Sequence, residues 1–324
     1  MIKARSLTRR KMATGAVAAT GGFAGLFRLR YSTSYAARFF RERLAETGRR
    51  IRSAPTKPTP GSWVQNDITA SWLGHATVLI NFFGIHILTD PVLFSRVGAN
   101  LRLGTLGPKR LIASALKARE LPPIDLVLLS HAHLDHFDIP SLRMFGGETQ
   151  VVTASGTSDL LRRTRLTIAG ELGWGGKQTV HTRQGSVKVT AFEVNHWGTR
   201  WRRDTHRGYN GYFLEREGKR IVFGGDTALC GNFRELKTMG KVHLAIMPIG
   251  AYNPWIRSHC NPEEALRMAN DAGAQFILPI HHQTFKLGRE PLAEPIERLE
   301  EALASEPDRL ALRGVGETFS LARR

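Results

Sequence analysis

The sequence predicts an α/β protein in which two β-sheets pack together between outer helices, a four-layer αββα sandwich. Hairpin patterns come first along the chain, and strand patterns then alternate with helix patterns. Sheets must have their apolar faces covered, so this order favours two sheets with helices outside. In addition, His and Asp residues repeatedly stand just after the predicted strands. No repeat or low-complexity segment interrupts residues 62–324, which we predict to form one domain.

The first predicted elements are strands. The stretch "ATVLINFFGIHILTD" contains two apolar runs that turn at Gly84, and Asp90-Pro91 ends the second. The stretch "DLVLLS", which ends at Ser130, is typical of a short buried strand. A helix is expected from Ile139, with Asp138 as its cap. The stretches "TQVVTA" and "SGTSDLLRRT" then predict a strand and a helix.

The second half of the chain continues the alternation. "VKVTAFEV" alternates as a half-buried strand does, and "GYFLEREGKRIVFGGD" predicts a hairpin that turns near Gly218. "VHLAIMPI" and "QFILPIH" are apolar strands. The helix between them, "NPEEALRMANDAGA", has Asn261 as N-cap, Pro262 at its first position and Gly273 at its end. "EPIERLEEALA" predicts a last helix, and "RLALRGVGETFSL" a closing strand.

The positive charge lies mainly at the N-terminus. The formal net charge is +18, of which residues 1–60 contribute +12 and residues 61–324 only +6. The domain itself is therefore not basic enough to indicate a nucleic-acid partner, and we expect none.

The N-terminal segment is typical of an export signal. Arg9-Arg10 precede a weakly apolar run over 12–27, and a small-x-small site lies before Ala37. These features favour a twin-arginine signal over residues 1–37, followed by a basic, Pro/Ser/Thr-containing linker over 38–61. The protein would then be exported, and periplasmic or membrane-associated in a bacterium. Alternatives are a disordered basic tail, a basic arm lying on a membrane, and a cytoplasmic protein whose leader is no signal.

Two cysteines, Cys230 and Cys260, are too few for a disulfide framework. One bridge between them and two free thiols are both compatible with the sequence.

The stretch "LLSHAHLDHFD" places four ligand-type side chains directly after a predicted strand. In an extended turn, His131 and His133 point the same way and can share one metal ion. Asp135 and His136 then turn toward a second ion, and Asp226 is a candidate to bridge the two. Imidazole and carboxylate groups suit two divalent ions, with Zn²⁺ expected first and Fe or Mn as alternatives.

Other polar residues follow later strands. His196, His259, the pair His281-His282 and Tyr252 stand in loops that should converge with the motif at one sheet edge. Isolated histidines are more often structural: His181, His206 and His243 are expected at the surface or in loops, and His75 and His86 as structural residues rather than ligands.

The order H-x-H-x-D-H, a later His, Asp226 in "GGDT" and a last His resembles the metallo-β-lactamase superfamily, over essentially all of residues 65–320. The phrases "WLGHATVLI", "FGGDTALCGNF", "MPIGAYNP", "HCNPEEAL" and "LPIHHQTF" together look like the N-acylphosphatidylethanolamine-hydrolysing phospholipase D group. True β-lactamases have Cys or Ser at the position of Asp226, which counts against that branch.

The resemblance implies a set of ligands and a proton-handling residue. One metal would be bound by His131, His133 and His196, the second by Asp135, His136 and His281, with Asp226 bridging. His281 rather than His282 matches the last ligand of the family. His259 matches a position beside the metals that is implicated in substrate handling or proton transfer.

Three functions are compatible with these residues. The first is a dinuclear phosphodiesterase acting on phospholipids of the N-acylphosphatidylethanolamine type or other small phosphodiesters, with His259 or Asp135 protonating the leaving alkoxide. The second is a lactone or carboxylic ester hydrolase in which Tyr252 serves the oxyanion. The third is a non-catalytic metal-binding envelope protein. Association with a membrane surface is expected for a lipid substrate, and the oligomeric state is left open.

A run of arginines follows His196. Arg200, Arg202, Arg203 and Arg207 would either bind phosphate or an anionic lipid headgroup, or belong to a solvated loop.

Overall fold

The computed structural model describes the chain except for residues 1–36, 38–40, 64–65, 102–103 and 323–324. The chain divides into two compact units, Met1–Arg49 and Arg50–Arg324. In the first unit, residues 41–45 are helical, and an Arg43 nitrogen lies 3.2 Å from a Glu46 carboxylate oxygen. The predicted export signal lies outside the described residues apart from Ala37. The second half of the predicted linker belongs to the same compact unit as the domain.

The first sheet has seven strands in the order β15-β1-β2-β3-β6-β7-β8. Its strands are β1 (Asn66–Gly74), β2 (Thr77–Phe82), β3 (Ile85–Thr89), β6 (Leu126–Leu129), β7 (Gln150–Ala154), β8 (Thr167–Leu172) and β15 (Thr318–Ala322). The turn predicted at Gly84 is confirmed, and this glycine has a φ of 89°, which suits a residue without a side chain. Strands β3, β6, β7 and β8 are parallel, so their carboxyl ends share one edge.

The second sheet has six strands in the order β14-β13-β12-β11-β10-β9. Its strands are β9 (Lys177–Thr182), β10 (Gly185–Phe192), β11 (Gly211–Arg216), β12 (Lys219–Phe223), β13 (Val242–Pro248) and β14 (Ala274–Ile280). The hairpin predicted around Gly218 joins β11 to β12. Strands β12, β13 and β14 are parallel, so here too several loops leave one edge together.

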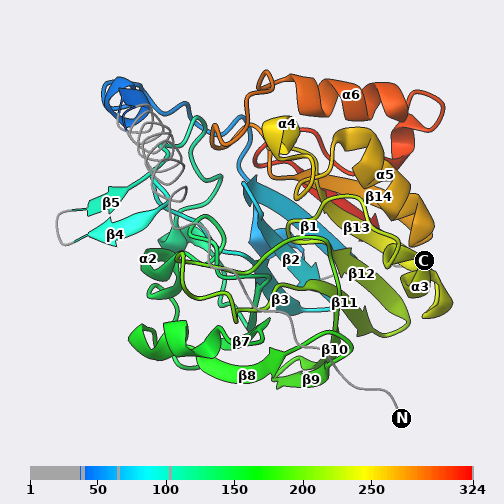
Figure 1. The fold of residues 1–324 in the computed structure, drawn as a ribbon. Coiled ribbons are helices and arrows are strands. Elements are labelled where there is room, and N and C mark those ends of the chain that lie inside the picture. Colours follow the sequence, from blue (N-terminus) through cyan, green and yellow to red (C-terminus); the bar gives the residue numbers. More distant parts are fainter. Residues whose placement is uncertain (1–36, 38–40, 64–65, 102–103, 323–324) are drawn as a thin grey trace, which may run out of the picture. The chain divides into compact units, whose positions relative to one another are not determined.

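Helix α5 lies beside β13 and β14 in Figure 1 and contacts both strands, and α6 packs next to α5. Asn261 caps α5 as predicted, accepting from the backbone N–H of Glu264 while the Glu264 carboxylate accepts from the Asn261 N–H. The α-helices of the second unit are α2 (Ile139–Leu142), α3 (Phe233–Thr238), α4 (Tyr252–Trp255), α5 (Pro262–Asp271) and α6 (Glu294–Ala302). Among the described residues, no helix is both long and apolar enough to cross a membrane.

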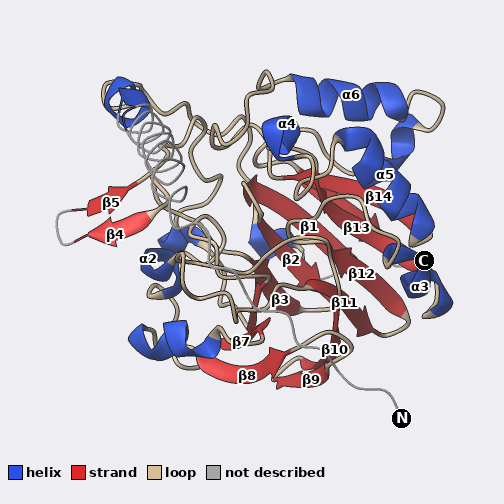
Figure 2. Cartoon of the chain, viewed as in Figure 1, coloured by secondary structure: helices blue, strands red, loops and turns tan. Residues whose placement is uncertain are grey.

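Short 3₁₀ helices and one small separate hairpin complete the secondary structure (Figure 2). The 3₁₀ helices are η1 (Pro60–Ser62), η2 (Ala118–Glu120), η3 (Ser158–Arg163) and η4 (Pro307–Arg309). The helix predicted after β7 is thus the 3₁₀ helix η3. The sequence predictions above do not include strands β1, β8 and β9 or the small hairpin of β4 (Ala99–Leu101) and β5 (Gly104–Leu106). Strands β4, β5, β8 and β9 are short and largely exposed, so they lack the apolar alternation that marks a strand. Strand β1 is buried, but its buried polar residues Thr69 and Ser71 weaken the apolar pattern.

The core has two main parts. One cluster combines side chains from both sheets, such as Ile80 and Leu128 from the first and Leu214 and Ile246 from the second. The other packs the second sheet against α3, α5 and α6. The predicted α/β fold of two sheets with outer helices is therefore confirmed.

One histidine was misplaced. His243 is not a surface or loop residue: it is buried on β13, and its Nδ1 accepts the backbone N–H of Arg220 at 3.2 Å. The apolar strand around it carries it inside, and this one hydrogen bond satisfies its ring nitrogen.

Candidate metal centre

The polar residues named above lie in loops that follow strands of both sheets. The motif His131–His136 follows β6, His196 follows β10, and Asp226 follows β12. His259 lies in the loop after α4, and His281 directly follows β14. Because both sheets send these loops to one edge, residues from far apart in the chain come together.

Three imidazoles converge at the first part of the site. His133 Nδ1 lies 2.8 Å from His131 Nε2 and 3.2 Å from His196 Nε2. The other nitrogen of His196 donates to the backbone carbonyl of Ser258 at 2.9 Å, because a carbonyl can only accept. The Nε2 of His196 must therefore carry a lone pair toward its neighbours.

The tautomer of His131 is fixed by a similar argument. The Ser130 hydroxyl donates to Asp90 Oδ2 at 2.5 Å, so the Ser130 oxygen accepts the Nδ1–H of His131 at 2.9 Å. The Nε2 of His131 then also presents a lone pair. Two lone pairs pointing at one His133 nitrogen cannot both be satisfied by a single proton, whereas a cation held among the three nitrogens would satisfy them all.

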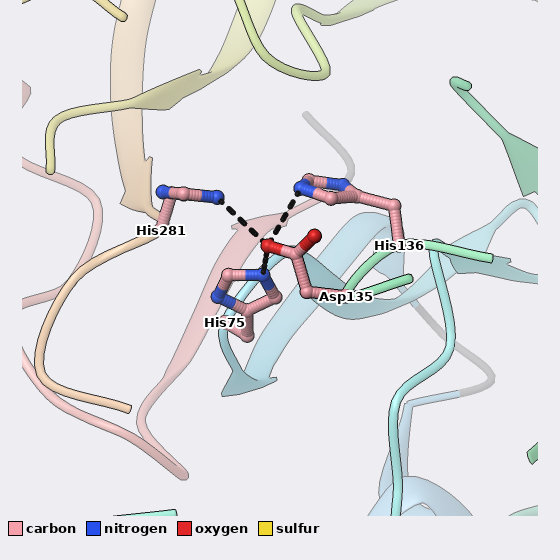
Figure 3. A group of neighbouring side chains, drawn as sticks. All are labelled: His75, Asp135, His136 and His281. Carbon is pink, nitrogen blue, oxygen red and sulfur yellow. Dashed lines mark hydrogen bonds and ion pairs between the residues drawn. The ribbon is translucent and has the colours of Figure 1, made fainter. Parts of the chain in front are cut away.

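The second part of the site surrounds Asp135 (Figure 3). Its Oδ2 lies 3.0 Å from His75 Nε2, 3.6 Å from His136 Nε2 and 3.7 Å from His281 Nε2. His136 Nδ1 donates to Asp90 Oδ2 at 2.7 Å, which leaves Nε2 as the nitrogen of His136 that faces the carboxylates of the site. Donor atoms of His75, Asp135, His136 and His281 lie close enough together to hold a metal ion.

Asp226 lies between the two parts. Its Oδ2 is 3.1 Å from His136 Nε2, 3.2 Å from His281 Nε2, 3.8 Å from His259 Nδ1 and 3.9 Å from His196 Nε2. Its other oxygen is buried without a hydrogen-bond partner. An orphaned buried carboxylate oxygen is costly, so this environment requires a cation.

The protonation states of the histidines at the site also support the binding of metal cations. Burial lowers the pKa of His133 to about 4, and it lowers the pKa values of His131 and His196 well below the usual range. These three imidazoles are therefore neutral at neutral pH, which is the form in which imidazole can bind a metal ion. Burial acts in the same direction on His281, but Asp226 and Asp135 outweigh it and raise the pKa of His281 to about 9. The two carboxylates thus draw positive charge to the centre, which divalent ions would supply.

Two residues that support the site were not predicted from the sequence. His75, expected as structural, donates from Nε2 to the Asp135 carboxylate at 3.0 Å and belongs to the second part of the site. Asp90, read only as the end of a strand, contacts Ser130 and His136 and so orients two imidazoles. The only signal was that both stand, like the other ligand-type residues, at the end of a strand.

Of the other residues predicted at the site, His259 lies at the cluster, whereas Tyr252 and His282 lie outside it. The ring of His259 lies between His196 and His281, with centroid distances of 5.1 and 5.3 Å. Tyr252 faces elsewhere: its hydroxyl donates to Glu294 at 2.6 Å and accepts from Arg298 at 3.2 Å. His282 stacks on Trp72 at 4.4 Å, outside the converging groups.

The arginines after His196 divide into two kinds. Arg200 donates to the carbonyls of Ala132 and Phe137, at 3.0 and 2.8 Å, and so holds both ends of the motif loop. Arg207 is buried and pairs with Asp159 and Asp204. Both are structural, whereas Arg202 and Arg203 are exposed.

Both cysteines are free thiols in the structure. Cys260 is buried beside His259, and its Sγ donates to the carbonyl of Pro248 at 3.2 Å.

Comparisons with known proteins agree with the metal site that the geometry indicates. A model of the β-lactamase superfamily domain matches residues 86–282. An uncharacterised protein of Mycobacterium tuberculosis is 31% identical over 76% of this chain and 66% of its own length. The N-acyl-phosphatidylethanolamine-hydrolyzing phospholipase D 1 of Caenorhabditis elegans is 29% identical over 75% of this chain and 72% of its own. The mitochondrial enzyme of that name from Saccharomyces cerevisiae is 32% identical over 71% of this chain and 50% of its own.

A solved structure shares the fold. Igni18, a metallo hydrolase from the archaeon Ignicoccus hospitalis, superposes with a TM-score of 0.59 at 18% identity, over 79% of this chain and 99% of its own. The family match covers most of the strands that build the two-sheet core and spans the motif loops from β3 to β14. The chain therefore belongs to the metallo-β-lactamase superfamily of metal-dependent hydrolases.

Proposed function

We propose that this protein is a dinuclear metal-dependent phosphodiesterase that cleaves phospholipids of the N-acylphosphatidylethanolamine type. The observation that carries the proposal is the position of Asp226, whose Oδ2 lies near the imidazoles of both ligand groups. A carboxylate in that position can bridge two ions, and paired ions suit in-line displacement at phosphorus. The two phospholipase D relatives supply the substrate class.

The ligand set follows from the convergence of side chains. The first ion would be held by His131, His133 and His196, and the second by Asp135, His136 and His281, with Asp226 shared. Zn²⁺ suits these ligands, as do Fe and Mn. When bound, such ions lower the pKa of water and stabilise negative charge on phosphoryl oxygens.

The chain itself supplies the proton transfer. His259 is the better placed to carry a proton to the leaving alkoxide, since its Nδ1 lies 3.8 Å from Asp226 Oδ2 and has no hydrogen-bond partner. Burial lowers the pKa of His259 to about 4, so its ring is neutral at rest and would first take up the proton that it then passes on. Asp135 is the weaker choice: despite burial, His136 and the neighbouring imidazoles hold its pKa well below the usual range, so it has no proton to give.

The decisive experiment compares two substrates. The metal-loaded protein should hydrolyse N-acylphosphatidylethanolamine and an aryl phosphodiester faster than a lactone, and Asp226→Ala should abolish this and lose at least one metal equivalent. His282→Gln, a neighbouring buried histidine outside the cluster, should retain both metals. Rapid lactone opening with no phosphodiester cleavage would instead support the ester hydrolase, and two bound ions without turnover of any of these substrates would support the non-catalytic alternative. Metal loss in His282→Gln but not in His281→Gln would refute our choice of the last ligand.

We also propose that residues 1–37 direct export by the twin-arginine route, on the motif alone. Replacing Arg9 and Arg10 by lysine should leave the protein in the cytoplasmic fraction of a bacterial host. Unchanged appearance in the periplasm would contradict the proposal.

A further inference from the structure

The loops that bring ligand-type residues to the site also expose large apolar side chains. In the loop after His196, the exposed fractions are 40% for Trp197 and 55% for Trp201. Before His259, Trp255 and Ile256 are 47% and 43% exposed, and Leu292 in the loop after His281 is 38% exposed. Single exposed apolar residues are common in soluble proteins, but a group of them around one site marks an interaction surface.

Contacts show that these three loops adjoin one another. The Trp197 ring lies 4.6 Å from the His133 ring and 6.4 Å from the His259 ring, and the Ser258 carbonyl accepts from His196. The first two loops therefore meet beside the metal ligands.

The third loop is joined to α4, in the second loop. The backbone N–H of Arg289 donates to the carbonyl of Asn253 at 2.8 Å. The Glu290 carboxylate accepts from the backbone N–H groups of Ala251 and Asn253. The three loops thus adjoin one another beside the candidate site, and we call the exposed side chains of residues 197–203, 255–257 and 286–292 the rim.

The charges of the rim are positive. Its exposed basic residues are Arg202, Arg203, Arg257, Lys286 and Arg289. The neighbouring acids are engaged within the loops: Asp204 accepts from Arg207 and from the backbone of Trp201, and Glu290 holds the two backbone groups named above. A surface that combines tryptophans with arginines and lysines complements the interface of a bilayer that contains anionic lipids.

We propose that the rim docks the protein on the surface of an anionic phospholipid bilayer, with Trp201, Trp255 and Ile256 entering the interfacial region. The entrance to the metal centre would then face the headgroups. This proposal rests on the exposed residues of the three loops and stands apart from the reaction catalysed within.

Vesicle binding tests the proposal. The metal-loaded full-length chain should co-sediment with vesicles of phosphatidylglycerol and phosphatidylcholine, and brominated lipids should quench its tryptophan fluorescence. The double variant Trp201→Ala/Trp255→Ala should bind at least about tenfold more weakly, since it removes two large apolar anchors. Arg202→Glu/Arg203→Glu should weaken binding to these vesicles at low salt.

Matched controls exclude general effects. Ile168, on β8, is 46% exposed, and Ile168→Ala should bind as the wild type does. Arg162→Glu/Arg165→Glu, which reverses two exposed charges outside the rim, should also bind normally. All variants keep the same N-terminal segment, so a difference between them reports on the rim.

The proposal falls if the tryptophan variant binds like the wild type, if the controls lose binding equally, or if the wild type does not bind these vesicles. Capture of a protein by the rim, with no vesicle binding, would likewise overturn it in favour of a protein partner. Hydrolysis of a water-soluble aryl phosphodiester should be unchanged in the tryptophan variant, which separates this test from that of the proposed function.

Discussion

Asp90 offers the sharpest test of how the chain holds its ligands. This carboxylate is fully buried and accepts three hydrogen bonds: from the backbone N–H of Ser130 at 2.8 Å, from the Ser130 hydroxyl at 2.5 Å and from His136 Nδ1 at 2.7 Å. Asp90→Asn preserves the shape of the side chain but replaces one acceptor oxygen by an NH₂ group. It also suits the backbone, because Asp90 has a φ of 32° and Asn tolerates the left-handed region.

The size of the expected loss of stability in Asp90→Asn follows from these three hydrogen bonds. Whichever way the amide turns, at least one donor faces another donor, which leaves a buried group unsatisfied at a cost of about 1–3 kcal/mol. The remaining bonds also weaken because the acceptor loses its charge. We expect the free energy of unfolding to fall by about 2–4 kcal/mol. Metal affinity should fall about 10–100-fold, because the tautomer of His136 is no longer fixed.

Two measurements check this expectation. Urea denaturation gives the change in stability, and competition with a chromophoric chelator gives the affinity for each metal equivalent. Asp125→Asn is the control, since Asp125 accepts a backbone N–H from His86 at 2.8 Å but orients no ligand. A folded Asp90→Asn protein with wild-type affinity for both ions would refute the argument that Asp90 orients His136.

Three further predictions concern other contacts. His75→Ala should lower metal affinity about tenfold by freeing Asp135; chelator competition that finds no change would contradict a role for His75 at the site. Arg200→Ala should lower the free energy of unfolding by about 2–4 kcal/mol, because two charge-assisted bonds to the motif loop are lost; a urea midpoint equal to that of the wild type would show that the loop needs no such support. Burial lowers the pKa of His243 to about 4, so the stability that its neutral form provides is present above the unfolded pKa of about 6.5 and is lost as pH falls toward 4. His243→Asn should therefore lose about 1–2 kcal/mol less than the wild type between pH 7 and pH 5, and equal losses in urea titrations would disprove this.

Most of the architecture could be predicted from the sequence because most of the core strands are marked by a clear apolar run. Apolar runs such as "DLVLLS" and "VHLAIMPI" are buried strands in the structure, and the caps of α2 and α5 are where their residue types placed them. Strands β8 and β9 could not be foreseen, since their burial is irregular and their pairing depends on partners elsewhere in the chain.

The candidate site was foreseen in its ligand types but not in its supporting contacts. Spacing within the motif and the positions of polar residues after strands were enough to bring His131, His196 and Asp226 together. Asp90 and His75 also stand just after strands, but an aspartate before a proline is typical of a turn and an isolated histidine is usually structural. Their contacts with Ser130 and Asp135 were therefore not foreseen. Tyr252 shows the opposite error: its loop leads to the site, but its hydroxyl turns to Glu294 on α6.

The pairing of β1 with β15 has a consequence for the synthesis of the protein. Asn66 lies opposite Ala322 in the ladder, so an edge of the first sheet is completed only by a strand that lies far downstream in the chain. Until then β1 exposes an unpaired edge, which can pair with other chains. The proposed metal ligands are likewise divided between segments far apart in the chain, from His131 to His281. We expect slow folding that depends on protection of the nascent chain, with metal capture among the final steps.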